Sequence, residues 1–347
     1  MYKIKQIPED FYVREASSIV ARKKGKYLYC ALKKKNYTTE RAAQAVADAL
    51  SIPRKRIGYA GAKDKNAVTE QVISVLGVSP ERIAGLSIRD IKLTVLGKGD
   101  EPVSLGDLEG NNFEILVRNL DSRDIKKITG AARKQPILVP NYFDEQRFSK
   151  SNCEVGRLIV KGRLKDACEL IVDDLTEKGK EAMSRNDFAG ALRTIPFKIL
   201  TMFVHSFQSY LFNSAVADYI KSRAGRVREV KYSLGSLTFP KLSYSYETGK
   251  PDFPVFGFGT ELEADETGEI YRNLISKEGV SQRDFIIRAV PDLSAEGGNR
   301  NLFFEVLDFR QSTPEDDELN CGKKKVLLKF FIARGSYATI AIRQLFL

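Results

Sequence analysis

The sequence predicts an α+β fold in a chain long enough for two domains. Its patterns follow one another as strand, helix, strand, strand, strand, helix, and not as a regular alternation of strands and helices. At 347 residues the chain exceeds a typical single domain. Beyond Arg147 the texture changes from alternating strands to helical patterns, so we expect a second domain to begin in that region.

Alternation and periodicity predict the elements of the first part. Period-two patterns predict strands over 26–32, 90–95 and 113–117. A helix over about 39–51 gathers small and apolar residues on one face and is closed by Pro53. A further helix follows Ser122, whose hydroxyl can cap it.

The second part contains longer helical patterns, over 166–192 and 203–220. His205, the only histidine, heads the latter helix, and we expect it to cap or pack because no Cys or carboxylate partner is near it in sequence. Residues 225–300 are rich in Gly, Pro, Ser and aromatic residues, which predicts loops and short strands.

The end of the chain predicts a return to the first domain. Residues 326–333 have the pattern of a buried strand, and Ser336 can cap a terminal helix through Leu345. A strand that follows a long insertion suggests that the C-terminal residues join the sheet of the first domain.

Basic residues are concentrated at the N-terminus. The formal charge is +11, and residues 1–60 hold fourteen Lys and Arg against five Asp and Glu, which is +9 of that total. Three basic clusters are interleaved with tyrosines: 22–26, 33–35 and 54–56, with Tyr27, Tyr29 and Tyr37. This mixture contacts phosphates and stacks on unpaired bases, so it favours a nucleic-acid partner over a purely solubilising surface.

The sequence excludes several other classes of protein. Four scattered cysteines and one histidine make a metal site improbable, and they favour a reducing cytoplasm without disulfides. The first residues lack the apolar core of a signal peptide, and the apolar stretch 197–204 is too short to span a membrane. Gly257 and Gly259 precede no helix pattern, so they do not predict a nucleotide-binding loop.

One stretch, GYAGAKDKNAVTEQ at 58–71, concentrates charge in a loop. Asp64 lies between Lys63 and Lys65, and the small residues at 58–62 let backbone and ligand approach closely. The lysines favour an ionised carboxylate and attract phosphate, which indicates a nucleophile beside a polyanion. The plainer interpretation is a solvated, charged turn between two strands.

The longer string resembles the signature of the TruD family of pseudouridine synthases, Gly-x-Lys-Asp-(Lys/Arg)-x-Ala-x-Thr-x-Gln. Four further stretches match motifs of that family in the expected order: PEDFYVRE at 8–15, GNNF at 110–113, VPNYFDEQRF at 139–148 and RGSYAT at 334–339. The chain is identified on these residues as an archaeal-type member of the family. Ser149 departs from the pattern, because many members have glycine at this position.

The resemblance implies a specific architecture and substrate. It implies a pseudouridine synthase core with a mixed, largely antiparallel sheet and flanking helices, built from 1–137 and 309–347, and an inserted α+β TruD-specific domain over 138–308. It also implies isomerisation of uridine to pseudouridine in tRNA, at position 13, by a cofactor-free, metal-free, cytoplasmic enzyme. We expect a monomer, although the residues themselves do not fix the oligomeric state.

The resemblance implies that Asp64 is the nucleophile, which attacks the sugar or assists formation of a glycal. Lys5 matches a lysine that often precedes the N-terminal motif, and it is the candidate partner of the Asp64 carboxylate. Lys63 is the alternative partner, unless it points away to phosphate.

Three further residues are expected to bind the uridine. Phe11 and Phe113 align with motif aromatics and would stack on the flipped base, although a core position is the plainer interpretation of each ring taken singly. Asn111 would hydrogen-bond the uracil edge or hold the aspartate loop.

Two functions from other classes remain as alternatives. A non-catalytic RNA-binding assembly factor would use the same basic surface, but it would have no need of Asp64. An RNA methyltransferase would need a glycine-rich S-adenosylmethionine loop, which we do not find in the sequence.

Overall fold

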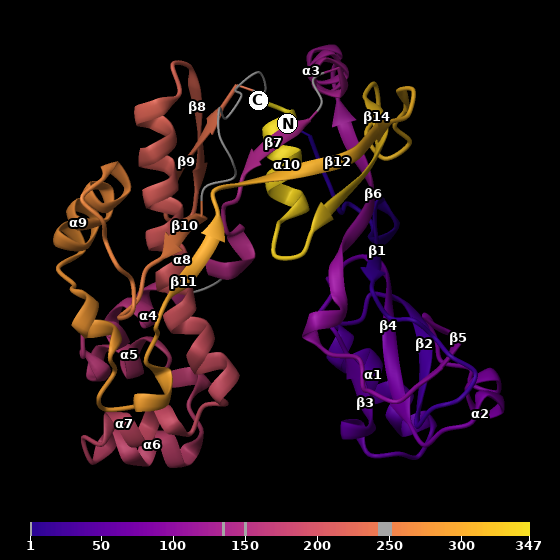
Figure 1. The fold of residues 1–347 in the computed structure, drawn as a ribbon, viewed down its shortest axis with the longest axis horizontal. Helices are drawn as coiled ribbons and strands as arrows, with labels where there is room; N and C mark the ends of the chain where they lie inside the picture. Colours follow the sequence, from indigo (N-terminus) through magenta and orange to yellow (C-terminus); the bar gives the residue numbers. More distant parts are fainter. Residues whose placement is uncertain (1, 134–135, 149–150, 242–251) are drawn as a thin grey trace. The chain divides into compact units, whose positions relative to one another are not determined.

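The computed structural model describes residues 2–133, 136–148, 151–241 and 252–347. Ser149, where the sequence departs from the family motif, lies outside the described residues. The chain divides into two compact units, labelled by element in Figure 1. The first comprises Met1–Ile137, Glu305–Ala338 and Phe346, and the second comprises Leu138–Phe304, Thr339–Leu345 and Leu347.

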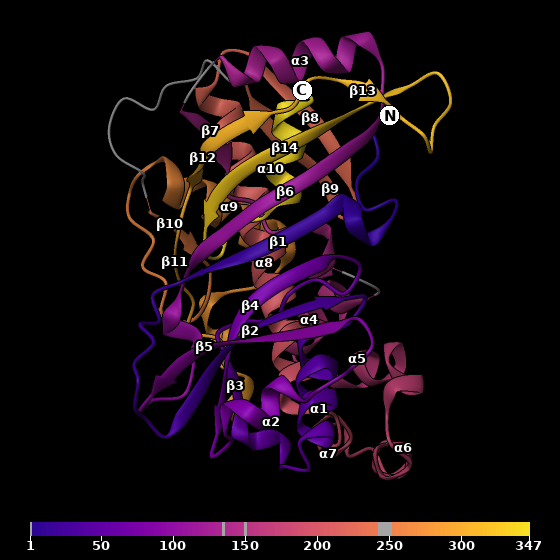
Figure 2. The same cartoon turned by 90° about the vertical axis from the view of Figure 1, so that its right-hand side faces the viewer.

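The first unit is built on one mixed sheet. The strands that the first unit contributes to this sheet are β1 (Phe11–Ser17), β2 (Tyr27–Lys35), β3 (Ile57–Tyr59), β4 (Val68–Leu76), β5 (Ile91–Gly99), β6 (Leu108–Leu120), β12 (Phe303–Gln311), β13 (Glu315–Asp316) and β14 (Lys324–Ala333). The order β5-β2-β4-β1-β6-β14-β12 can be followed in Figure 2, with β3 on β4 and β13 on β14. The β1–β4 pair is parallel and the other pairs are antiparallel. The expected α+β class with a mixed, largely antiparallel sheet is confirmed.

Helices of the first unit are α1 (Thr39–Ala49), α2 (Pro80–Ala84) and α3 (Ser122–Ala132). Helix α1 begins where the Thr38 hydroxyl accepts a hydrogen bond from the Arg41 N–H, and its buried face packs on side chains of β2 and β4. The expectation that Ser122 caps α3 is wrong. Asp121 is the cap, because its carboxylate accepts from the N–H groups of Arg123 and Asp124.

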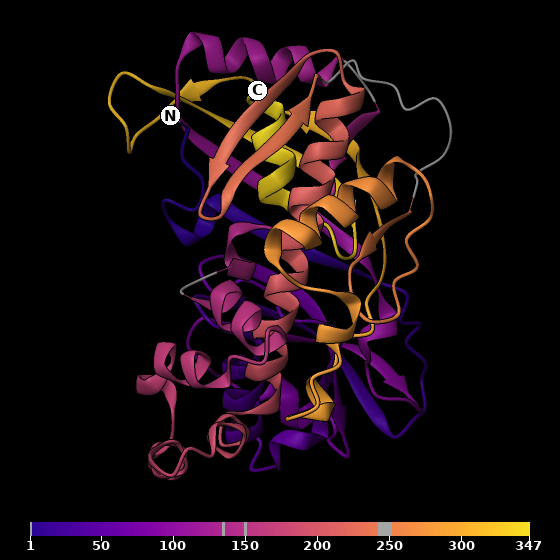
Figure 3. The same ribbon diagram turned by 90° about the vertical axis from the view of Figure 1, so that its left-hand side faces the viewer.

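The second unit is mainly helical around one long helix. Its helices are α4 (Asn152–Val160), α5 (Leu164–Leu170), α6 (Glu177–Ser184), α7 (Phe188–Arg193), α8 (Phe197–Arg223), α9 (Glu266–Glu278) and α10 (Ala338–Leu345). Figure 3 shows α8, against which α4 and α9 pack. The single pattern predicted over 166–192 is divided into α5, α6 and α7. No helix among the described residues is long and apolar enough to cross a membrane.

Three expectations for the second half are wrong. His205 lies inside α8 and not at its head, because the helix already begins at Phe197. Helix α9 occupies part of the stretch expected to hold loops and short strands; the Asp265 carboxylate caps it, and Gly279 ends it at φ +62°. Helix α10 groups with the second unit, where Gln344 donates a hydrogen bond to the Pro240 carbonyl at 2.9 Å.

The remaining strands of the second half are short. They are β7 (Ile137–Pro140), β8 (Val227–Tyr232), β9 (Gly235–Pro240), β10 (Asp252–Val255) and β11 (Gly298–Asn301). Strands β8 and β9 form one antiparallel pair, and β10 and β11 form another.

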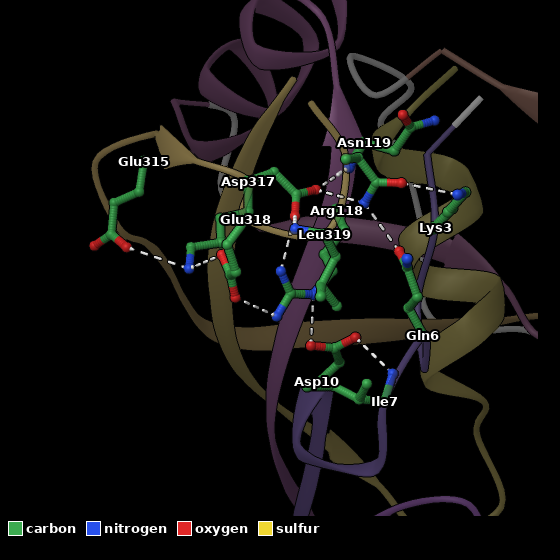
Figure 4. Close-up of polar contacts among 12 residues, drawn as sticks. Lys3, Gln6, Ile7, Asp10, Arg118, Asn119, Glu315, Asp317, Glu318 and Leu319 are labelled. Carbon is green, nitrogen blue, oxygen red and sulfur yellow. Dashed lines mark hydrogen bonds and ion pairs between the residues drawn. The ribbon is translucent and has the colours of Figure 1, made fainter. Parts of the chain in front are cut away.

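A buried charge cluster lies at one end of the first unit's sheet (Figure 4). The Arg118 side chain on β6 is 2% exposed and binds Asp10, Asp317 and Glu318 at 2.7, 2.8 and 3.0 Å. Burial alone would raise the pKa of Asp317. Hydrogen bonds from the Asn119 N–H, the Asn320 amide, the Leu319 N–H and Arg118 outweigh it and lower this pKa to about 2.

Replacing Asp317 with Asn should lower the free energy of unfolding at pH 7 by about 2–4 kcal/mol, because the buried guanidinium loses an ionised partner. The pKa is lowered on folding, so the stability that this carboxylate contributes is complete above about pH 4 and is lost as the pH falls toward 2. The difference in Tm between wild type and Asp317→Asn should therefore narrow between about pH 4 and pH 2. A difference that stays constant over this range would contradict the assignment.

Candidate active site

The register of the sheet brings four motif residues to one face. Phe11 lies opposite Ile115, and Glu15 lies opposite Asn111 across the antiparallel β1–β6 pair. Because side chains alternate along a strand, Phe11 and Glu15 share a face with Asn111 and Phe113. The N-terminal and the Gly-Asn-x-Phe motifs are therefore two halves of one surface.

Two phenylalanines form a buried aromatic row with Phe330 of β14. The Phe11 and Phe113 rings are 5.8 Å apart in an edge-to-face arrangement, and Phe113 stacks on Phe330 at 5.5 Å. Phe11 is 1% exposed and Phe113 is 7% exposed. The Lys5 ammonium lies over the Phe11 ring, 4.0 Å from its centroid. In this state the Phe11 face is covered, which is the geometry of a core ring.

Asp64 forms an ion pair with Lys5. The Lys5 Nζ lies 3.2 Å from the Asp64 Oδ1, and their side chains are 17% and 29% exposed. Both atoms are therefore partly shielded from water and still accessible. The ion pair therefore holds in place a carboxylate that a substrate can still reach, and a carboxylate is a group that can act as a nucleophile.

Lys63 points elsewhere. Its Nζ lies 2.6 Å from the Glu15 Oε2, with side-chain exposures of 6% and 0%. Of the two lysines proposed as partners of Asp64, the structure pairs Lys5 with it and takes Lys63 into a buried bridge to β1. The Lys63 ammonium consequently does not point to solvent, where a phosphate would bind.

Lys34 also binds the loop that carries Asp64, from the protein interior. This side chain on β2 is 1% exposed and donates to the main-chain carbonyls of Asp64 and Tyr37 at 2.9 and 2.6 Å. Burial lowers the pKa of Lys34 to about 8, although the charge of Asp64 opposes this shift and that of Lys63 adds to it.

Two polar side chains complete the loop's attachment. The Thr39 hydroxyl, at the start of α1, accepts from the Lys63 N–H at 2.8 Å and donates to the Gln71 amide oxygen at 2.8 Å. Gln71, on β4, donates in turn to the Gly61 carbonyl at 2.9 Å. Elements α1, β2 and β4 thus each hold the backbone that carries Asp64.

Two motif glycines are required by close packing. A Cβ on Gly58 would lie 2.7 Å from the Ser74 hydroxyl and 2.9 Å from the Val103 carbonyl. A Cβ on Gly110 would collide with the Phe331 ring and the Ile332 carbonyl. Gly58 therefore makes room for the Ser74 side chain on β4 and for the Val103 carbonyl of a loop, so the close approach found there is to the chain itself.

Asn111 has an unsatisfied acceptor. Its amide oxygen is buried and has no hydrogen-bond partner among the described residues. A buried acceptor without a donor costs free energy, so this atom is ready to receive a ligand N–H.

The basic N-terminal surface is narrower than its sequence suggests. Lys34 and Tyr29 are buried, and Tyr37 is packed against the core. The exposed basic residues of the three clusters are Arg22, Lys23, Lys24, Lys26, Lys33, Lys55 and Arg56. Lys34 belongs to the interior, so the cluster at 33–35 is divided between the surface and the site.

Sequence reasoning gave Glu15 and Thr39 no role in the site, and it assigned Lys34 to the basic surface. The signal for Lys34 is the strand period, since Leu28, Cys30 and Leu32 are buried and Lys34 continues the same face. Within the described residues, no group of three or more His, Cys, Asp or Glu side chains could hold a metal ion.

The chain matches known proteins along nearly all of its length. A family profile described as "tRNA pseudouridine synthase D (TruD)" matches residues 2–186, 180–231 and 239–345. A Methanosarcina mazei protein described as "Probable tRNA pseudouridine synthase D" is 30% identical, with 99% of this chain and 92% of the relative covered. A Methanopyrus kandleri protein of the same description is 32% identical, with 90% and 84% covered.

A solved structure is also similar. The crystal structure of the putative tRNA pseudouridine synthase D from Methanosarcina mazei superposes with a TM-score of 0.72, at 28% identity, over 99% of this chain and 93% of that chain. The family match and the shared architecture agree with the five motifs read from the sequence. The chain belongs to the TruD family of tRNA pseudouridine synthases.

Proposed function

We propose that this protein isomerises uridine to pseudouridine in tRNA, with Asp64 as the nucleophile. The observation that carries the assignment is the ion pair between Lys5 and Asp64, in a loop attached to three elements of the core. Family membership supplies the reaction, and this loop supplies a carboxylate that is ionised, positioned and partly exposed.

The reaction breaks the bond between C1′ of the ribose and N1 of uracil. Asp64 attacks the sugar, or assists formation of a glycal, while the uracil is held in the site. The base rotates and its C5 bonds to C1′, which releases the sugar from Asp64 if the two were joined. C5 then loses its proton, and N1 is protonated. Because product and substrate have the same atoms, the reaction requires no redox or group-transfer cofactor.

Lys5 is the partner that holds the Asp64 carboxylate in position in this scheme. Lys63 acts indirectly, because its bridge to the buried Glu15 fixes the residue that precedes Asp64. A buried carboxylate left without that lysine would be strongly destabilising, so the bridge restricts the loop.

The base would be held by residues of β6. The unsatisfied amide oxygen of Asn111 can accept a hydrogen bond from the uracil N3–H. Phe113, which is more exposed than Phe11, is the better placed ring to stack on the base, and Phe11 supports it edge-on.

We further propose that residues 1–137 and 309–347 form the catalytic core and that residues 138–308 form the inserted TruD-specific domain. The target is the uridine at position 13 of tRNA, the site of action is the cytoplasm, and the enzyme works as a monomer. The exposed basic residues of the first unit support binding of a polyanion.

Replacing Asp64 with Asn should abolish isomerisation while leaving the Tm and the tRNA affinity nearly unchanged, because the side chain is isosteric and only its charge is lost. The measurement is release of tritium from tRNA labelled at C5 of uridine. A variant that still releases tritium at a substantial fraction of the wild-type rate would remove Asp64 from the mechanism.

The neighbours Lys33 and Lys34 offer a matched pair of variants. Lys34→Met should slow the single-turnover step at saturating tRNA about tenfold or more and leave the Kd unchanged, because Lys34 holds the Asp64 carbonyl from the interior. Lys33→Met should weaken binding, most at low salt, and leave the saturated rate unchanged, because Lys33 is exposed. If Lys34→Met weakened binding and Lys33→Met slowed the saturated step, the assignment of Lys34 to the site and of Lys33 to the binding surface would be contradicted.

Phe11 and Phe113 should respond differently to Leu. Phe11→Leu should lower the Tm and leave the saturated rate close to wild type, because the ring fills the core. Phe113→Leu should slow the reaction by more than its loss of stability explains, because an aliphatic side chain lacks a flat face for the base. Two variants that melt early but react at the wild-type rate would show that neither ring stacks on uridine.

A further inference from the structure

We propose that the Arg118 node, which comprises Arg118, Asp10, Asp317 and Asn320, is a positioning device that holds Lys5 against Asp64. The proposal rests on the function proposed above, and it assigns to this remote cluster a specific part in the reaction. None of the four node residues belongs to the loop that carries Asp64.

Lys5 has a backbone conformation that needs external support. Its φ is 57°, in the left-handed region that residues with a Cβ rarely occupy. It lies in the segment 2–7, which precedes the 3₁₀ turn Pro8–Asp10 and belongs to no strand. Contacts outside this segment must therefore fix its conformation.

The node binds the segment before Lys5. The Lys3 N–H donates to the Arg118 carbonyl, and the Arg118 N–H donates to the Lys3 carbonyl, both at 2.9 Å. The Lys3 ammonium also donates to the Asn320 amide oxygen at 2.8 Å.

The node also binds the segment after Lys5. The Asn320 amide donates to the Gln6 side-chain oxygen at 2.9 Å, and the Ile7 N–H donates to the Asp10 carboxylate at 3.0 Å. Figure 4 shows these contacts converging on one cluster. Main-chain and side-chain groups of the same network therefore hold Lys3, two residues before Lys5, and Gln6 and Ile7, one and two residues after it.

Burial makes the bracket rigid. The Arg118 guanidinium joins Asp10 to Asp317, whose side chains are both fully buried. Asp317 holds Asn320 in turn, since the Asn320 amide donates to its carboxylate at 2.8 Å. A shift of the segment would carry the Lys5 ammonium away from its 3.2 Å contact with Asp64, so the node controls the ion pair from a distance.

The test is a double-mutant cycle with Lys5→Met. Asn320→Ala removes ties to Lys3 and Gln6 without stranding a buried charge, and it should lower the single-turnover rate at saturating tRNA about tenfold with an unchanged Kd. In the Lys5→Met background it should cause no further loss, because the residue through which it acts is already gone. Lys325→Met is the matched control: it removes an ion pair with Glu318 and should leave the rate unchanged.

Hydrogen exchange provides a readout that does not depend on turnover. Asn320→Ala and Arg118→Lys should speed exchange at the amides of Lys3 and Ile7, and Lys325→Met should not. Equal losses of rate in both backgrounds, a wild-type rate in Asn320→Ala, or unchanged exchange at both amides would overturn the proposal. Substantial turnover by Asp64→Asn would instead overturn the proposed function and leave the exchange result standing.

Discussion

The pairing of β1 with β4 on one side and β6 on the other is the constraint on which the site depends. Its register sets Glu15 opposite Asn111 and places Phe11 beside Phe113, on one face of the sheet. A slip of one residue in β1 would turn Phe11 and Glu15 to the face opposite Asn111 and Phe113. Glu15 then draws Lys63 inward, so the next residue, Asp64, is presented at the surface of the core.

Three lysines, Lys5, Lys34 and Lys63, lie around the loop that carries Asp64, and they differ in burial and in the groups that they bind. The charge of Lys63 is neutralised by Glu15. The Lys34 ammonium donates hydrogen bonds to main-chain carbonyls, and burial lowers the pKa of Lys34 to about 8. Lys5 remains partly exposed with Asp64. Buried charges restrict a structure more than they stabilise it, because removal of either partner is costly. In this arrangement two lysines fix the loop and one pairs with the candidate nucleophile Asp64.

The fold class and a candidate nucleophile could be predicted from the sequence, because the patterns that indicate both are local. Alternation gave strands near β2, β5 and β6, and a contiguous motif singled out Asp64. The bridge from Lys63 to Glu15 and the Arg118 node could not be predicted in this way, because they join residues far apart in the chain and only the tertiary register brings them together. Lys34 was missed for another reason: lysine is rarely buried, so its place in the strand period was overlooked. Helix α9 was not predicted, because the stretch around it is rich in glycine and proline, which are typical of loops.

The central claim is that Asp64, held by this register and charged beside Lys5, converts one uridine of tRNA into pseudouridine. The most direct measurement is carbodiimide mapping of an unmodified tRNA transcript after incubation with the protein, read by primer extension. Wild-type protein should produce one strong new stop that reports a pseudouridine at position 13, and Asp64→Asn should produce none. The absence of any new stop with wild-type protein, or the same stop with Asp64→Asn, would contradict the account.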